Sequence, residues 1–278
     1  MAKTETQDPN EMSFLDHLEE LRWHLIRSVV AVVLIACVAF VMKSFIFDTV
    51  IFGPKKMDFP TYRFFCNIAT FFEITSEFCA DAFPFTIQNR TMAGLFSAHI
   101  WTSIWAGVIV GFPYILWELW RFISPGLHDN ERKYSRGFIL IASILFFLGV
   151  LFGYYVVAPL SINFLGTYTV SKEVTSEIDL SNFIATVRAS VLACGLLFEL
   201  PIIIYFLTKI GLVTPEILRK YRKIALVVVL ILSAIITPPD VTSQIVVAIP
   251  VLLLYQVSIY ISKLVVKQEA KKVKRNAK

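Results

Sequence analysis

The sequence is dominated by six apolar stretches, and most of them are long enough, as helices, to cross a lipid bilayer. Hydrocarbon about 30 Å thick needs about 20 helical residues to cross it. Of the 278 residues, 56% are hydrophobic and 17% charged, which is more apolar surface than one soluble core could bury. We therefore predict an all-α integral membrane protein with six transmembrane helices. The predicted spans are Ile26–Phe45, Ala93–Leu119, Phe138–Leu160, Phe183–Leu207, Ile224–Ile236 and Val241–Ile261.

The last two stretches are short. At 1.5 Å a residue, Ile224–Ile236 covers only about 20 Å. The turn Thr237-Pro238-Pro239-Asp240 separates it from the sixth stretch, and Asp240 is expected near one membrane surface. The pattern predicts a short helical hairpin, accommodated by local thinning of the bilayer or by shelter from neighbouring helices. The alternative is a buried helix pair without functional thinning.

Lysine and arginine predict the orientation. Most of the 26 Lys and Arg residues lie before the first span, after the second, after the fourth and after the sixth. Loops rich in these residues stay in the cytoplasm, so both termini are predicted to be cytoplasmic. The acidic, polar N-terminus does not resemble a secretory signal, so the first span is expected to be retained. The basic tail is expected to lie on anionic lipid, and the net charge of +5 does not argue for nucleic acid.

These patterns divide the chain into three parts. They are a cytoplasmic amphipathic segment over residues 1–25, a transmembrane domain over 26–262 and a basic cytoplasmic tail over 263–278. The predicted external loops are about 46–92, 161–182 and 237–241, and the predicted cytoplasmic loops are about 120–137 and 208–223.

One acid interrupts the fourth stretch. Glu199 lies in the apolar run from Ala189 to Leu207. An ionised carboxylate in hydrocarbon is costly, so such a residue usually has a partner or a water-lined cavity. Glu199 is therefore a functional candidate. The alternatives are a hydrogen bond to a Ser or Thr of a neighbouring helix, or a helix bend made with Pro201.

The first external loop carries two of the four cysteines, Cys66 and Cys79. An oxidising external compartment would allow a disulfide between them, although two free thiols fit the spacing as well. Cys37 and Cys194 lie inside spans and are expected to be buried apolar side chains. The loop is also rich in aromatic residues, which favours packing over the outer helix ends or at the membrane interface.

Two cytoplasmic segments offer further carboxylates. Before the first span, Glu19 and Glu20 lie on the polar side of an amphipathic helix, so at least one can face a cytoplasmic ligand. Its apolar face consists of Phe14, Leu18, Leu21 and Leu25, after Ser13 as the N-cap candidate. A membrane-surface helix with a solvated charged face also explains this pattern. In the second cytoplasmic loop, helix capping explains Asp129 but not Glu131.

Four motifs in this order resemble the TatC family, the multispanning subunit of the twin-arginine protein translocase. They are His17-Leu18-Glu19-Glu20-Leu21-Arg22, then Phe122-Ile123-Ser124-Pro125-Gly126-Leu127 with Glu131-Arg132, then Phe198-Glu199-Leu200-Pro201, and Thr237-Pro238-Pro239-Asp240. The resemblance covers about Phe14 to Lys263. It implies a cup-shaped helix bundle that receives folded proteins bearing twin-arginine signal peptides. It also implies small single-span partner subunits of the TatA and TatB type, self-association in the complex and use of the proton-motive force.

The resemblance also implies roles for individual residues. Glu20 and Glu131 match the carboxylates that recognise the arginine pair, and Arg22 and Phe122 match the same cytoplasmic site. A planar guanidinium pairs bidentately with a carboxylate, so two acids can read two adjacent arginines. Glu199 matches an intramembrane group that contacts a partner's helix. Turn or loop positions of the family match Pro54, Pro238, Pro239 and Asp240.

Two features depart from the family pattern. The first external loop is longer than the family's usual loop, so its packing is not inherited. Arg188, toward the outer end of the fourth span, lies outside the pattern, and it can snorkel to the interface or pair with Asp179.

Other classes of function fit less well. A proton-coupled transporter of a small solute could use Glu199, but no repeat relates the first three spans to the last three. No phosphate-binding loop or H-E-x-x-H motif occurs, and the four histidines are scattered, so we predict no catalysis, no metal and no cofactor. A scaffold that holds partners without reading a signal would not need Glu20 and Glu131.

Overall fold

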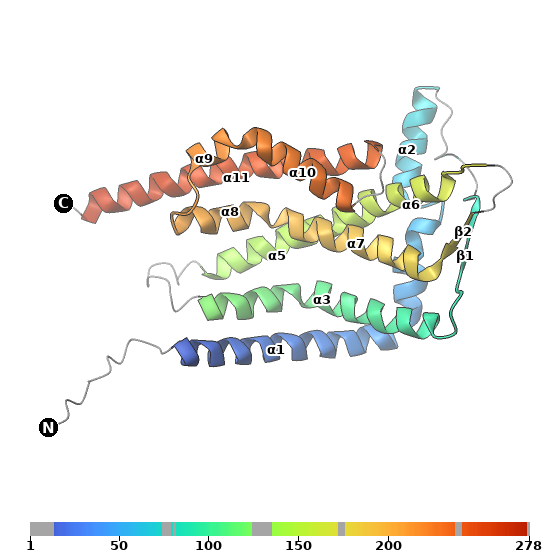
Figure 1. Cartoon of the computed structure of the whole chain (residues 1–278), viewed down its shortest axis with the longest axis horizontal. Helices are drawn as coiled ribbons and strands as arrows, with labels where there is room; N and C mark the ends of the chain where they lie inside the picture. The colour runs from blue at the N-terminus through green and yellow to red at the C-terminus, as the bar shows by residue number, and fades with distance from the viewer. Residues whose placement is uncertain are drawn as a thin grey trace. The chain divides into compact units, whose positions relative to one another are not determined.

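The computed structural model describes residues 14–73, 79, 82–123, 135–171, 176–236 and 241–276, which are largely helical (Figure 1). Its elements are α1 Phe14–Val41, η1 Phe45–Ile51, η2 Gly53–Lys55, α2 Pro60–Phe71, β1 Phe85–Gln88, α3 Gly94–Ile123, α5 Ser135–Phe152, η5 Gly153–Val157, α6 Ala158–Thr167, β2 Ser176–Asp179, α7 Leu180–Phe198, α8 Leu200–Lys209, α9 Pro215–Lys220, α10 Arg222–Ile236 and α11 Val241–Asn276. They form two compact units, one of residues 1–41 and 101–143, the other of residues 42–100 and 144–278.

Five helical segments of the described residues are long and apolar enough to cross a membrane. They are Leu18–Val41, Gly94–Ile123, Gly137–Thr167, Leu180–Lys209 and Gln244–Ala270. They match five of the six predicted spans. The remaining predicted span, Ile224–Ile236, lies in the 15-residue helix α10. That helix is short, as its sequence predicts. The chain is thus a helical membrane protein, and a sixth span remains a prediction.

The final helix differs from the short helix expected. α11 has 36 residues and continues through the predicted basic tail as far as Asn276. The reason is local, because the sequence from Ser262 to Asn276 contains no glycine or proline and is rich in good helix formers. Pro238, Pro239 and Asp240 lie outside the described residues.

In the first unit, α1 packs closely on α3. A Cβ atom added to Gly107 would lie 2.6 Å from the carbonyl oxygen of Val32, so only glycine allows this approach. Ala36 is buried on the same face of α1, whereas Cys37 is exposed beside it, contrary to the expectation that it is buried. α1 also runs without a break through the predicted boundary at residue 25, since no proline or glycine interrupts it.

In the second unit, the described part of residues 46–92 contains more regular structure than the predicted loop. They contain η1, η2, α2 and β1, and Tyr62 of α2 is fully buried there between the rings of Phe59 and Phe83. Some of the aromatic residues of this segment therefore pack, among them Phe59, Tyr62 and Phe85, whereas Phe64, Phe71 and Phe72 are exposed. Cys66 and Cys79 are joined by a disulfide in the structure.

Two short strands qualify the all-α expectation. β1 and β2 pair in parallel with Phe85 opposite Ser176 and Gln88 opposite Asp179. Asp179 then caps α7, since its Oδ1 accepts a 2.8 Å hydrogen bond from the backbone N–H of Ser181. This hydrogen bond lowers the pKa of the Asp179 carboxyl.

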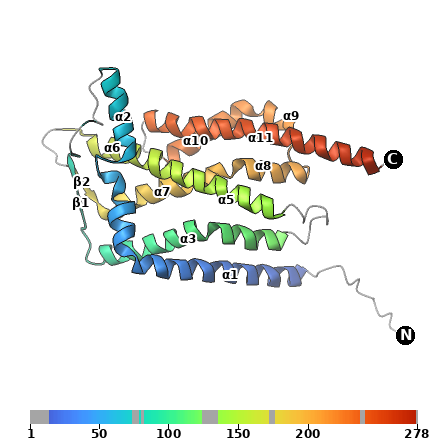
Figure 2. The same ribbon diagram turned by 180° about the vertical axis from the view of Figure 1, so that it is seen from behind.

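Glycine also sets the contact of α5 and the following η5 with α7, and Figure 2 shows α5 and α7 side by side. A Cβ at Gly149 would lie 2.5 Å from the carbonyl oxygen of Cys194, and one at Gly153 would lie 2.6 Å from that of Ser190. Such contacts between backbones are typical of packed membrane helices. Cys194 is buried, as expected.

The C-terminal helices complete the second unit. α8 and α10 both pack against α11, as Figure 1 shows. The hydroxyl of Thr208 donates a 2.9 Å hydrogen bond to Ser262, and the hydroxyl of Tyr255 donates to the carbonyl oxygen of Leu218. Val157, Cys194, Val229, Val247, Ala248 and Val251 form a buried cluster beneath them.

Candidate functional site

Those predicted signal-binding residues that the structure describes lie near the start of α1 and the end of α3. Glu20 and Arg22 are exposed on α1, and Phe122 is half-buried on the last turn of α3. Glu131 lies outside the described residues. The three described residues therefore lie on two helices that pack together in the first unit.

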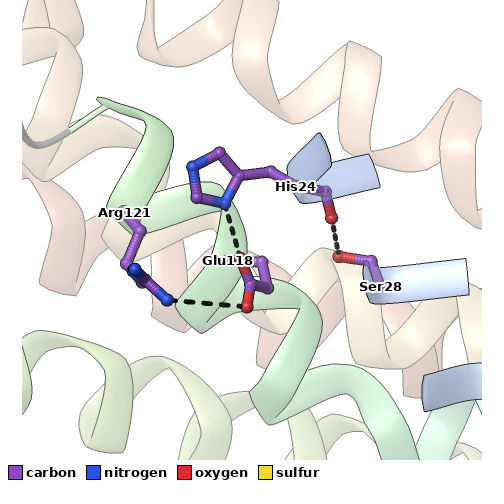
Figure 3. A network of polar contacts seen from close by, with 4 residues as sticks. All are labelled: His24, Ser28, Glu118 and Arg121. Atoms are coloured by element: carbon purple, nitrogen blue, oxygen red, sulfur yellow. Dashed lines mark hydrogen bonds and ion pairs between the residues drawn. The ribbon is translucent and has the colours of Figure 1, made fainter. Parts of the chain in front are cut away.

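A buried polar network joins these two helices one turn deeper (Figure 3). The Nδ1 atom of His24 on α1 lies 2.5 Å from the Oε2 atom of Glu118 on α3. The side chain of Glu118 is only 1% exposed and that of His24 is 14% exposed. A buried carboxylate is costly without hydrogen bonds, and here the imidazole N–H supplies one.

Further groups surround the Glu118 carboxylate. A nitrogen of Arg121 lies 3.9 Å from Oε1, and the hydroxyl of Tyr114 contributes a side-chain hydrogen bond. Arg121 also lies over the ring of Trp117, 5.3 Å from its centroid. The carboxylate therefore has partners from its own helix in addition to His24.

The network also contacts a predicted site residue. The ring of His24 lies 6.3 Å from the ring of Phe122, in an edge-to-face arrangement. The hydroxyl of Ser28 donates a 2.9 Å hydrogen bond to the backbone carbonyl of His24. His24 is thus held at its backbone by α1 and at its ring by two residues of α3.

Glu118 was not predicted as a site residue, although its sequence context carries a local signal. The predicted span Ala93–Leu119 is not free of charge, because Glu118 lies inside it between Trp117 and Trp120. The rule that singled out Glu199 applies equally to Glu118. His24 was noted only as one of four scattered histidines, since nothing local indicates a partner 94 residues away.

Glu199 lies where the fourth predicted span breaks. It is 7% exposed and separates α7 from α8, with Pro201 in the first turn of α8. Its backbone carbonyl accepts hydrogen bonds from Ile202 and Ile203. Its Oε1 atom has no hydrogen-bond partner among the described residues. The helix is therefore interrupted at Glu199, just before Pro201, and the buried carboxyl still lacks a full set of partners.

Pro54 has a structural environment. It is buried in η2, and its carbonyl oxygen accepts a 2.8 Å hydrogen bond from the hydroxyl of Tyr62. No group of His, Cys, Asp and Glu suited to a metal ion occurs among the residues that the structure describes.

The chain is similar to known proteins over nearly its whole length. A family model described as Sec-independent protein translocase protein (TatC) matches residues 16–250. The Sec-independent protein translocase protein TatC of Blattabacterium sp. subsp. Periplaneta americana (strain BPLAN) is 46% identical over 94% of this chain and 99% of its own length. The protein of the same name from Halalkalibacterium halodurans is 34% identical over 91% of this chain and 90% of its own.

A solved structure agrees with these sequence matches. A crystal structure of a twin arginine translocase receptor, TatC, is 32% identical and superposes with a TM-score of 0.66. The match covers 90% of this chain and 99% of that one. The family model, the relatives and the fold lead to one conclusion: this chain belongs to the TatC family of Sec-independent protein translocase proteins.

Proposed function

We propose that this chain is a receptor for twin-arginine signal peptides and the core subunit of a translocase that exports folded proteins across the bacterial cytoplasmic membrane. The proton-motive force drives the export. The observation that carries the proposal is the exposed carboxylate of Glu20 on α1, in a chain of the TatC family. As a member of that family the chain is a transport component and not an enzyme. The family also favours this function over transport of a small solute.

The chemistry suits the ligand. A guanidinium group presents parallel N–H donors that match the two oxygens of a carboxylate, whereas a lysine ammonium is a point charge. Glu20 reads one arginine of the signal and Glu131 the other, while Phe122 packs against the peptide and Arg22 orients the cytoplasmic loop. Both termini lie in the cytoplasm, where signal peptides arrive.

Removing the two acids is expected to abolish peptide binding. Photocrosslinking of a twin-arginine peptide to membranes containing the full chain should fall about tenfold for each of Glu20→Ala and Glu131→Ala, because each loses a charge-assisted hydrogen-bonded pair. A twin-lysine peptide should bind weakly to the unaltered chain. The matched control is Glu19→Ala, an exposed acid beside Glu20 that projects about 100° away around the helix and should change little. Unchanged crosslinking by the double variant, or equal binding of the twin-lysine peptide, would contradict the proposal.

Small single-span subunits of the TatA and TatB type are the proposed partners of Glu199, and the complex contains more than one copy of this chain. A buried carboxyl oxygen without a partner is rare in a folded protein, and a polar group on a neighbouring helix would satisfy it. Supply of that group by a partner subunit accounts for the incomplete hydrogen bonding within the chain.

Replacing Glu199 separates partner contact from signal binding. Glu199→Ala should reduce crosslinking to the single-span partner roughly threefold to tenfold, the usual effect of losing a hydrogen bond between membrane helices. Peptide binding should stay near its original level, and Glu199→Gln should retain most of the partner contact. The exposed acid Glu216 provides the control substitution to alanine. Partner crosslinking at the original level in Glu199→Ala would remove Glu199 from the interface.

A further inference from the structure

We propose that the His24–Glu118 pair is a positioning contact that holds the two halves of the signal site, one on α1 and the other on α3, at a fixed separation. The inference rests on the function proposed above and extends it to two residues outside the four family motifs. Neither residue needs to touch the peptide. Their part is to keep Glu20 and Phe122 in register with each other.

The spacing along both helices carries the argument. Glu20 precedes His24 by one helical turn on the same face of α1, and Phe122 follows Glu118 by one turn on α3. Each predicted site residue thus lies about 6 Å along its helix from the 2.5 Å contact between His24 and Glu118. The ring of His24 contacts Phe122 as well. A change in the His24–Glu118 distance would therefore be passed to both sides of the site.

Packing alone does not explain the buried His24–Glu118 pair. Burying a carboxylate in a membrane helix costs free energy, and apolar side chains of similar size often pack at least as well as a buried ion pair. If the contact serves to position the two helices and not to stabilise the fold, stability and peptide binding should respond differently to its removal. Compared with removal of His24 alone, removal of both partners should restore stability but not peptide binding.

The first test compares three variants of the full chain in detergent. His24→Leu leaves the Glu118 carboxylate buried without its imidazole partner, so both thermal stability and peptide binding should fall. His24→Leu combined with Glu118→Leu removes the unpaired charge, so stability should return to near the original level. Twin-arginine peptide binding by this double variant should stay about tenfold weak, since a site assembled one tenth of the time binds one tenth as tightly. His24→Asn keeps an N–H donor near the Nδ1 position and should retain binding.

Two results would overturn the proposal. One is a double variant that binds the peptide as tightly as the original chain. The other is a His24→Asn variant that is as stable as the original chain but binds the peptide as weakly as His24→Leu does. If the leucine pair fails to fold, His24→Leu with Glu118→Gln replaces the charge by a neutral amide and serves the same comparison.

A distance measurement separates this proposal from the proposed function. Spin labels at Leu18→Cys and Ile123→Cys, both exposed positions in the same unit, report the separation of the site's two sides without any peptide. The exposed Cys37 is first replaced by alanine. One narrow distance should broaden in the leucine double variant, and an unchanged distribution would refute the positioning role. Failure of the original chain to bind peptide, with a distance that still depends on the pair, would instead refute only the proposed function.

Discussion

Replacing Gly149 by leucine is expected to yield no folded protein. The α5 backbone at this position is so close to α7 that a Cβ atom would lie 2.5 Å from the carbonyl oxygen of Cys194 and 2.8 Å from the Cα atom of Gly195. Both obstacles are backbone atoms, so no rotamer change relieves the overlap, and the helices must separate. Even Gly149→Ala should lower the free energy of unfolding by about 1–3 kcal/mol or more. Thermal unfolding in detergent, followed by size exclusion, measures both variants.

The same helix provides the control. Gly137 lies near the start of α5, and an added Cβ there meets no atom within 4 Å. Gly137→Ala should be neutral or stabilising by up to about 1 kcal/mol, because alanine is the better helix former. Gly137→Leu should fold. If Gly149→Leu unfolds at the same temperature as Gly137→Leu, the close approach of α5 and α7 is not required for the fold.

Much of the fold could be predicted because hydropathy is a local property. Five of the six predicted spans coincide with helices long enough to cross a membrane, and the fifth stretch is a short helix as its length indicates. The helical extension of α11 was missed because the prediction ended the helix where hydrophobicity ended. Lys263 and the residues after it are polar but remain good helix formers.

Structure that depends on distant contacts could not be predicted in this way. The segment before α3 looked like a long loop rich in aromatic residues, and its strand β1 is defined by pairing with β2 far along the chain. Strand pairing and burial of Tyr62 are tertiary properties, and no short period in the sequence encodes them.

The candidate site shows the same division. Glu20 and Phe122 were found because they lie in short motifs that resemble a family. Glu118 and His24 were missed because their importance lies in one contact across 94 residues. A carboxylate in an apolar run is a local signal, however, and applying that rule to every predicted span would have found Glu118 together with Glu199.

The largest buried side chain of the segment before α3 provides the second large effect. Tyr62 is 0% exposed, and its hydroxyl is 2.8 Å from the carbonyl oxygen of Pro54 and 2.9 Å from that of Pro159. One hydroxyl proton thus serves two carbonyls, one in η2 and one in α6. Tyr62 therefore holds Pro54, the loop proline that resembles a family position, against the helix that follows η5.

Two substitutions divide the contribution of Tyr62 into its ring and its hydroxyl. Tyr62→Ala should destabilise by about 3–5 kcal/mol, since it leaves a cavity in a packed aromatic cluster. Tyr62→Phe should cost about 1–3 kcal/mol, because both carbonyls lose their donor. Phe64→Ala on the same helix removes an exposed ring and should change stability little. Near-equal unfolding temperatures for Tyr62→Phe and the original chain would show that the two carbonyls do not need the hydroxyl.

The burial of Tyr62 also makes the stability of the fold depend on pH, because it raises the pKa of the Tyr62 hydroxyl. The folded state therefore holds its proton more tightly than the unfolded chain does, so the contribution is complete below the ordinary tyrosine pKa of about 10. Above that pH the unfolded state loses the proton first, and stability falls as pH rises. Tyr62→Phe should remove this alkaline component. An unfolding curve for Tyr62→Phe that declines above pH 10 as steeply as that of the original chain would assign the decline to other groups.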